Sequence, residues 1–159
     1  MPQIRHFLDN PDKNRHYRAR KDVQTMEEKI KQYFAAETEV AAVYLFGSFA
    51  SQKNRPASDV DLAILFLPEY LPSADRFCGR YLTDLGRQLR KDIHPVVMNR
   101  AGDVLLKQIF LKGIQVVVKN PDFVSEFNMI AMSRIADFGF YLDRMQAGLK
   151  KSMQEKVHG

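Results

Sequence analysis

Two short apolar runs, residues 40–46 and 60–66, set the strongest limit on what this chain can fold into. They are not built on an alternation of apolar and polar residues, and such runs are typical of strands that are covered on both faces of a sheet. The first run ends at a Gly-Ser pair, residues 47–48, and the second follows Asp59 and contains Asp61. We therefore expect two buried strands that bring a Gly-Ser turn and two carboxylates to one place.

The segments around these runs predict helices alternating with further short strands. Apolar residues recur at helical spacing in some segments, whereas others are short and rich in β-branched residues. Together with the two buried runs, they indicate an α/β (α+β) fold class. The expected helices cover residues 25–37, 73–91, 103–112 and 123–150, and the further strands cover residues 93–98 and 114–118.

Local signals place the ends of several of these elements. Thr25 and Glu28 have the Ser/Thr-x-x-Glu form of a helix N-terminus, so the first ordered helix is expected to begin at Thr25. Pro95 lacks a backbone N–H, which predicts an edge strand or a bulge. Gly113 follows a helical segment and suits the left-handed position just beyond it. Asn120 and the proline after it are typical of a cap and a first helical position.

The last helical segment has an unusually wide apolar surface. Either both of its apolar rows belong to the core, or one row packs on a partner chain, since Met and Phe are common in docking surfaces. The first row is Phe123, Phe127, Ile130, Phe138, Leu142, Met145 and Leu149, interrupted by Arg134, and the second is Met129, Met132, Ala136 and Phe140.

Length and charge favour one domain with a basic leader. A chain of 159 residues is long enough for one domain with a sizeable core. Residues 1–21 carry six basic and two acidic residues, so +4 of the net charge of +5 lies there. We interpret residues 1–21 as a basic, flexible extension, residues 22–152 as the domain and residues 153–159 as a flexible tail. Because the rest is nearly neutral, direct nucleic-acid binding is not expected.

Cysteine and hydropathy exclude several classes of protein. The single Cys78 excludes an internal disulfide framework and a multi-cysteine zinc site. No apolar run approaches the roughly 18–20 residues that cross a bilayer, and no apolar signal segment opens the chain. We expect a cytoplasmic protein without membrane contact.

The two acids next to the Gly-Ser pair point to metal–nucleotide chemistry. Side chains alternate along a strand, so Asp59 and Asp61 should project from the same face, where they repel each other unless a cation lies between them. Mg²⁺ prefers oxygen ligands and leaves room for substrate phosphates. Gly47 lets a phosphate approach the backbone, and Ser48 supplies a hydroxyl. The alternative is that both acids are simply solvated at a strand edge.

The pattern Gly47-Ser48-x10-Asp59-x-Asp61 resembles the nucleotidyltransferase superfamily with the polymerase-β-like fold, and more closely the minimal nucleotidyltransferases, called MNT. The resemblance runs from about residue 40 to residue 150. It implies a small mixed sheet flanked by helices, Asp59 and Asp61 as catalytic metal ligands, and Gly47, Ser48 and Ser58 at the nucleotide. It also implies Mg²⁺ as cofactor and ATP as substrate. MNT proteins of this size are typically antitoxins paired with a HEPN-domain ribonuclease toxin, and some transfer AMP to a tyrosine of the toxin.

This sequence departs from the family where a third carboxylate often stands. His94 occupies that position, with Asp92 two residues earlier. A neutral His94 can act as a base near pH 7, but it is a poor ligand for Mg²⁺. It can also be a strand histidine with a structural hydrogen bond. Asp92 could replace it only if the strand register shifts, for example through a bulge at Pro95.

The sequence is compatible with two functions. The first is an enzyme that transfers AMP from Mg²⁺-bound ATP to a protein hydroxyl, in the family's terms a tyrosine of a HEPN toxin. The second is an antitoxin that neutralises its toxin by binding alone, which the histidine and the wide apolar helix favour. Transfer to a small molecule and DNA polymerisation rank lower, because the chain has no second domain to hold such substrates.

Overall fold

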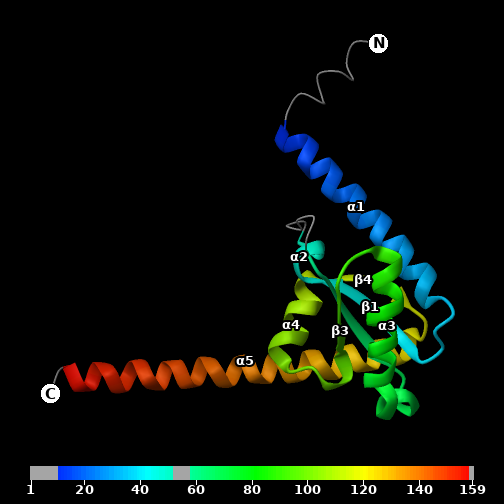
Figure 1. The fold of residues 1–159 in the computed structure, drawn as a ribbon. Coiled ribbons are helices and arrows are strands. Elements are labelled where there is room, and N and C mark those ends of the chain that lie inside the picture. The colour runs from blue at the N-terminus through cyan, green and yellow to red at the C-terminus, as the bar shows by residue number, and fades with distance from the viewer. Residues whose placement is uncertain (1–10, 52–57, 158–159) are drawn as a thin grey trace.

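The computed structural model describes residues 11–51 and 58–157. Within that part of the chain, no helix is both long enough and apolar enough to cross a membrane. The elements follow one another as α1 (Pro11–Phe34), β1 (Val40–Phe46), α2 (Gly47–Ala50), β2 (Val60–Phe66), η2 (Pro68–Ser73), α3 (Ala74–Leu89), β3 (Ile93–Val97), η3 (Met98–Arg100), α4 (Asp103–Lys112), β4 (Ile114–Val118) and α5 (Pro121–Val157) (Figure 1).

The strands form one mixed sheet with the order β3-β2-β1-β4. Strand β1 runs antiparallel to β2 and to β4, whereas β2 and β3 run parallel. The two central strands are buried along almost their whole length, which explains their continuous apolar sequences. The predicted α/β class is confirmed, and the bounds of β1 and β2 agree with the two apolar runs.

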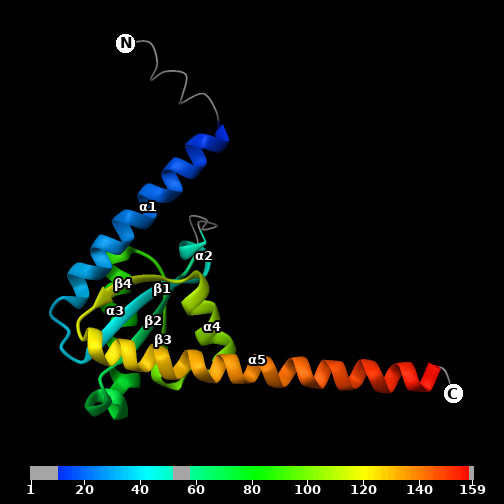
Figure 2. The same cartoon turned by 180° about the vertical axis from the view of Figure 1, so that it is seen from behind.

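Helices cover both faces of the sheet, as Figures 1 and 2 show. On one face, α1 and α3 contribute Ile30 and Tyr81 to a buried cluster with alternate residues of β1 and β2. On the other, α4 and α5 contribute Leu106 and Val124 to a second cluster. The sheet is therefore the middle of three layers, and its polar residues are confined to its ends and edges.

The edge position of β3 is consistent with its proline. Pro95 stands in the middle of β3, which has a strand neighbour only on the β2 side. Beyond β3, Asn99 completes the end of β2, because its side-chain amide accepts from the backbone N–H of Phe66 and donates to the carbonyl of Phe66, both at 3.0 Å. The predicted edge strand is thus confirmed.

The first helix begins earlier than the sequence signal predicted. Helix α1 already includes Pro11, and the Thr25 hydroxyl donates to the Lys21 carbonyl at 2.9 Å inside the helix. The prediction of a start at Thr25 is wrong because the apolar row continues upstream. Val23 and Met26 are both buried, and they precede Ile30 at helical spacing. The predicted division at residues 21 and 153 stays a prediction, and residues 1–10, 52–57 and 158–159 lie outside the described part.

The last helix also differs from its prediction. Asn120 caps it as expected, accepting from the N–H of Phe123 at 3.1 Å, but α5 reaches Val157 rather than ending near residue 150. The interpretation of both apolar rows as core is wrong, since Met129 and Phe140 are 68% and 66% exposed. The second half of α5 extends away from the domain (Figure 1).

The glycine after α4 is needed for close packing and not for a left-handed turn. Gly113 has φ −76°, so the predicted left-handed conformation is wrong. A β-carbon at Gly113 would instead lie 2.4 Å from the carbonyl oxygen of Ile109. The chain turns from α4 into β4 so tightly that only glycine fits without a shift of the backbone.

Candidate active site

The turn after β1 brings the backbone of Gly47 against Asp61. Phe46 pairs with Asp61 in the antiparallel register, and α2 begins at the next residue, Gly47, with φ +71°. A β-carbon at Gly47 would lie 2.1 Å from Oδ2 of Asp61. Both the left-handed backbone and the carboxylate therefore require glycine here. The predicted juxtaposition of the Gly-Ser pair with an acid is confirmed, and Ser48 follows directly within α2.

The two acids face a single imidazole ring. Nε2 of His94 lies 3.8 Å from Oδ2 of Asp59, and Nδ1 of His94 lies 3.5 Å from Oδ1 of Asp61. Because one ring reaches both carboxylates, Asp59 and Asp61 project from the same side of the sheet, as alternation along β2 predicted. Their side chains are 44% and 29% exposed, so the cluster is open to a ligand and Asp61 is the more enclosed acid.

Partial burial determines which protonation state Asp61, the more enclosed of the two acids, prefers. Loss of hydration raises the pKa of Asp61 above its usual value, and the negative charge of Asp59 raises it further, whereas His94 acts to lower it. The carboxylate form of Asp61 is thus disfavoured by its surroundings. A cation bound between Asp59 and Asp61 would relieve both effects.

The strand register decides which residue stands at the third-acid position. In the parallel pair β2–β3, Asp61 lies opposite His94, and the register continues without a shift through Pro95, which lies opposite Leu62. Asp92 precedes the strand, and its backbone carbonyl accepts from the N–H of Val60 at 2.8 Å. The register shift that would put Asp92 in place of the histidine does not occur. His94 is the side chain that meets both acids.

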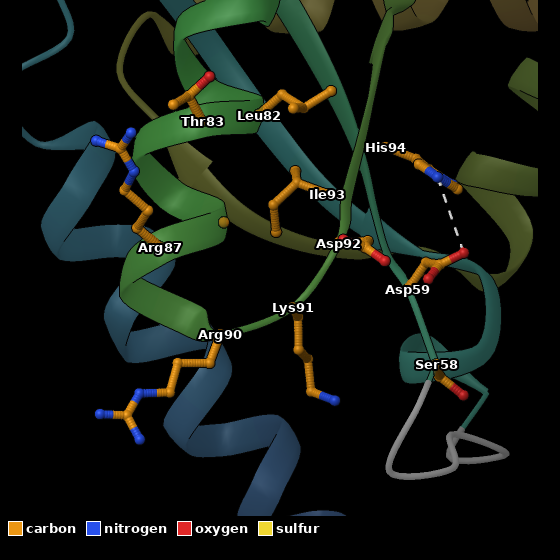
Figure 3. Close-up of a pocket in the computed structure, with 11 residues that line it drawn as sticks. Ser58, Asp59, Leu82, Thr83, Arg87, Arg90, Lys91, Asp92, Ile93 and His94 are labelled. Atoms are coloured by element: carbon orange, nitrogen blue, oxygen red, sulfur yellow. Dashed lines mark ion pairs between the residues drawn. The ribbon is translucent and has the colours of Figure 1, made fainter.

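A groove of about 660 Å³ runs from this cluster along the end of α3. Figure 3 shows Asp59 and His94 turned toward each other beside it. Asp61, Gly47 and Ser48 are not part of its wall among the described residues. The wall consists of Ser58, Asp59, Leu82, Thr83, Gly86, Arg87, Arg90, Lys91, Asp92, Ile93 and His94.

Three basic residues in this wall were not singled out from the sequence. Arg87, Arg90 and Lys91 stand at or just beyond the end of α3, and Arg87 and Arg90 extend away from Asp59 in Figure 3. The ammonium of Lys91 lies 5.2 Å from the ring centroid of Phe49 in α2, which brings a positive charge beside the helix of Ser48. Clustered basic residues directly before the strand that carries His94 were the available signal.

The donor set fits a hard divalent cation only in part. Two carboxylates on one side of a strand supply the oxygen ligands that Mg²⁺ prefers, and the raised pKa of Asp61 indicates a place where positive charge is favoured. No cluster of three or more acidic, histidine or cysteine side chains suited to a metal occurs in residues 11–51 and 58–157. Mg²⁺ held here would need further oxygens from a bound substrate.

Comparison with known proteins places the chain in a family. The family described as Polymerase beta, Nucleotidyltransferase matches residues 28–122, which span β1, α2, β2 and β3 with all of the cluster. The chain belongs to this nucleotidyltransferase family. No curated protein matches the chain.

Solved structures share the fold of this member of the nucleotidyltransferase family. A chain of a toxin–antitoxin crystal structure with AMP-PNP is 23% identical, with a TM-score of 0.59, and the match covers 80% of this chain and 98% of that one. A chain of a complex between a tri-AMPylated Shewanella oneidensis HEPN toxin and an MNT antitoxin is 22% identical, with a TM-score of 0.56 and coverage of 82% and 98%. At these identities the likeness shows the fold, and the predicted polymerase-β-like fold is confirmed.

Proposed function

We propose that this nucleotidyltransferase is an MNT-type antitoxin that transfers AMP from ATP to a hydroxyl, in our proposal a tyrosine, of a cognate HEPN toxin. The observation that carries the proposal is that Gly47 lies against Asp61 and that Asp59 lies beside Asp61. There a backbone without a β-carbon adjoins one of two acids that face the same side. That combination suits a nucleotide triphosphate whose charge must be neutralised while a phosphorus atom is attacked.

The reaction exchanges one phosphorus–oxygen bond for another. The oxygen of the acceptor hydroxyl bonds to the α-phosphorus of ATP, and the bond from that phosphorus to the oxygen bridging to the β-phosphate breaks. Pyrophosphate leaves with the bond electrons, and the hydroxyl proton passes to a base of the site. The protein itself mainly positions the two reactants and excludes competing geometries.

The residues of the cluster have separate parts in this scheme. Gly47 and Ser48 would lie against the phosphates, and Ser58 would extend the same wall beside Asp59. Asp59 and Asp61 would hold Mg²⁺, which when bound neutralises phosphate charge and polarises the phosphorus. Lys91 adds a positive charge close to α2, where the leaving phosphates would pass.

His94 is the residue best placed to take the proton of the acceptor. Its ring adjoins both acids, its side chain is 57% exposed, and it lines the groove by which an acceptor would approach. A neutral imidazole can accept a proton near pH 7 without occupying a metal position. In this role His94 takes the place of the third carboxylate in the family pattern.

The solved structures of similar fold support the choice of partner. One is described as a tri-AMPylated HEPN toxin in complex with an MNT antitoxin, and another as a toxin–antitoxin with AMP-PNP. Those descriptions concern the other proteins. For this chain they make a HEPN toxin the acceptor to test first, in the cytoplasmic setting that the sequence suggested.

The direct test is to weigh the acceptor. Purified protein is incubated with ATP, Mg²⁺ and the product of the neighbouring gene, and mass spectrometry should find the acceptor heavier by one or more AMP groups. The double variant D59A/D61A should abolish the added mass. D22A/D84A, which removes two exposed aspartates elsewhere, is the matched control and should leave transfer unchanged. An acceptor of unchanged mass with the parent protein would count against transfer.

A second candidate is an antitoxin that works by binding alone. It is favoured by one observation, the imidazole of His94 standing between Asp59 and Asp61 where a metal-binding acid is expected. In cells that express both proteins, neutralisation that survives D59A/D61A would support binding alone. Loss of neutralisation with a folded D59A/D61A protein would reject it.

A further inference from the structure

The groove beside the acids has a part that the nucleotide would not use. Among the described residues its wall contains neither Gly47 nor Ser48, so phosphates bound at the Gly-Ser pair would lie outside it. The groove runs instead from Asp59 and His94 toward the end of α3 (Figure 3). A reaction that joins two molecules needs a second place for the acceptor, and this groove begins at the imidazole proposed to take the acceptor's proton.

The far end of the groove carries two arginines. Arg87 in the last turn of α3 and Arg90 directly after the helix both line the wall and extend away from Asp59 (Figure 3). Both are exposed, and within the described part of the chain neither forms an ion pair with an acidic side chain. A guanidinium offers a fork of donors that fits a carboxylate. This end of the groove therefore favours an acidic ligand.

The backbone of Arg90 is a separate observation that points the same way. Its φ of 52° and ψ of 44° are left-handed, and it is the one non-glycine residue with positive φ among the described residues. Glycine is the usual residue just past a helix, because a β-carbon strains this conformation. Positive charge favours a helix C-terminus, but Arg87 already supplies it there. A strained arginine at the wall of a groove is better explained by a use of its side chain.

The middle of the groove offers apolar contact and limited room. Leu82 is 51% exposed in the wall, and the hydroxyl of Thr83 is already used within the helix, where it donates to the carbonyl of Gly79 at 3.1 Å. The volume of about 660 Å³ lies within the range of ligand sites, about 300–1,000 Å³. The groove can thus hold a few side chains of an extended segment, but not a folded domain.

We propose that this groove binds the segment of the acceptor protein that carries the reactive hydroxyl, and that acidic side chains next to that hydroxyl pair with Arg87 and Arg90. The inference rests on the proposed function, since it specifies the acceptor of the same site. The hydroxyl lies at His94, and a neighbouring side chain packs on Leu82. Arg87 and Arg90 select the acceptor and do not touch the reacting atoms.

The first test measures binding of a segment without any transfer. Two fluorescent peptides, Glu-Glu-Tyr-Glu-Glu and its neutral counterpart Gln-Gln-Tyr-Gln-Gln, are titrated with the full chain at low salt, without nucleotide or Mg²⁺. The acidic peptide should bind about tenfold more tightly or better, and R87E should remove most of that preference.

A charge reversal elsewhere in the same helix is the matched control for R87E. Arg76 is exposed, belongs to α3 and lies outside the groove wall. R76E should keep the preference for the acidic peptide. Because R76E and R87E change the net charge equally, the comparison also removes nonspecific attraction. Equal binding of the two peptides to the parent, or an equal loss in R76E, would overturn the proposal.

The second test separates the acceptor from the nucleotide. With the product of the neighbouring gene as acceptor, R87E should raise the KM for the acceptor about tenfold, while kcat and the KM for ATP change by less than about twofold. A rise in the KM for ATP with an unchanged KM for the acceptor would mean that the nucleotide occupies the groove, and the proposal would be wrong.

Glycine at position 90 tests the use of the strained arginine. R90G should melt no lower than the parent, because glycine relieves the left-handed strain, but should bind the acidic peptide about threefold more weakly or worse. A merely structural residue would not show this opposite change. Parent-like binding by R90G would refute the role of Arg90.

Failure of the proposed function would look different from failure of this inference. If no AMP is transferred, but the parent prefers the acidic peptide and R87E does not, transfer is rejected and the groove remains a site for an acidic segment. If AMP is transferred but the parent shows no such preference, the transfer reaction stands and the assignment of the groove is rejected.

Discussion

At Gly47 the backbone has φ +71°, and an oxygen of Asp61 occupies the space that a β-carbon would need. The residue therefore carries two constraints at once, one from its own conformation and one from a side chain on the neighbouring strand. The sequence indicated a Gly-Ser turn here, but the left-handed conformation is known only from the structure, and the contact with Asp61 depends on the pairing of β1 with β2.

We predict that G47A lowers nucleotide transfer about 100-fold, because displacing Asp61 by an ångström misplaces the reacting groups. The left-handed backbone adds about 1–2 kcal/mol of destabilisation. Steady-state transfer and urea unfolding measure the two effects. G79A is the control, since a β-carbon at Gly79 in α3 meets nothing within 4 Å and should leave transfer unchanged. A G47A protein with full activity would contradict the role of this contact.

For His94 we predict a chemical role and not a structural one. H94A should lower transfer about 100-fold, the usual size of a lost general base, while leaving the melting temperature unchanged because the side chain is 57% exposed. D92A should retain activity, because the register puts His94 opposite Asp61. Rates measured for both variants with the same acceptor check the prediction, and equal losses would refute it.

At the scale of elements, an ionic cluster around the buried Glu39 joins the end of α1, the start of β1 and the middle of α3. Glu39 is 5% exposed and accepts from the hydroxyl of Tyr81 at 2.6 Å and from Arg80 at 2.7 Å. Arg80 also binds Glu37, and the Tyr33 ring packs edge-on to Tyr81. The cluster lies outside the proposed active site, so its contribution is to stability.

The same contacts shift the titration of the cluster. Burial raises the pKa of Tyr81 well above its usual value, and the bond to Glu39 raises it further. Burial likewise raises the pKa of Tyr33 to about 12. Although burial acts to raise the pKa of Glu39, hydrogen bonds headed by that from Tyr81 hold it below its usual value. The pKa of Glu37 is raised, chiefly by burial. The pKa shifts of Glu37 and Glu39 therefore have opposite effects on stability as the pH falls.

The sign of the tyrosine shifts predicts alkaline sensitivity. Because the folded-state pKa values exceed the ordinary value of 10.0, the stability they contribute is fully present below about pH 10 and is lost as the pH rises through the folded values. Y81F should cost about 1–3 kcal/mol near pH 7, since it removes the Tyr81 hydroxyl from the buried Glu39 carboxylate and leaves Arg80 as its side-chain donor, and should reduce the alkaline loss. Urea unfolding from about pH 8 to about pH 11 tests both. An unchanged alkaline slope in Y81F would show that another group causes the loss.

At the scale of the whole molecule, α5 is part of the domain in its first half and an extension in its second. We predict that removing residues 141–159 lowers the melting temperature by only about a few degrees, because the removed side chains that the structure describes are exposed. A131D should unfold the protein or cost about 3 kcal/mol or more, since Ala131 is 2% exposed and a charge there has no partner. Circular dichroism melts of both variants compare the two halves. A large loss on truncation would place the end of α5 in the core.

The sequence alone determined the two central strands, their polar ends and the class of the fold, because uninterrupted apolar runs leave a strand few alternatives to burial. It also indicated Gly47, Asp59 and Asp61 through their spacing. Only the tertiary structure decided that His94 and not Asp92 meets the acids, that Lys91 stands beside α2, and that one row of α5 is buried over half its length. Strand register and burial depend on partners far away in the chain, and local spacing does not specify them.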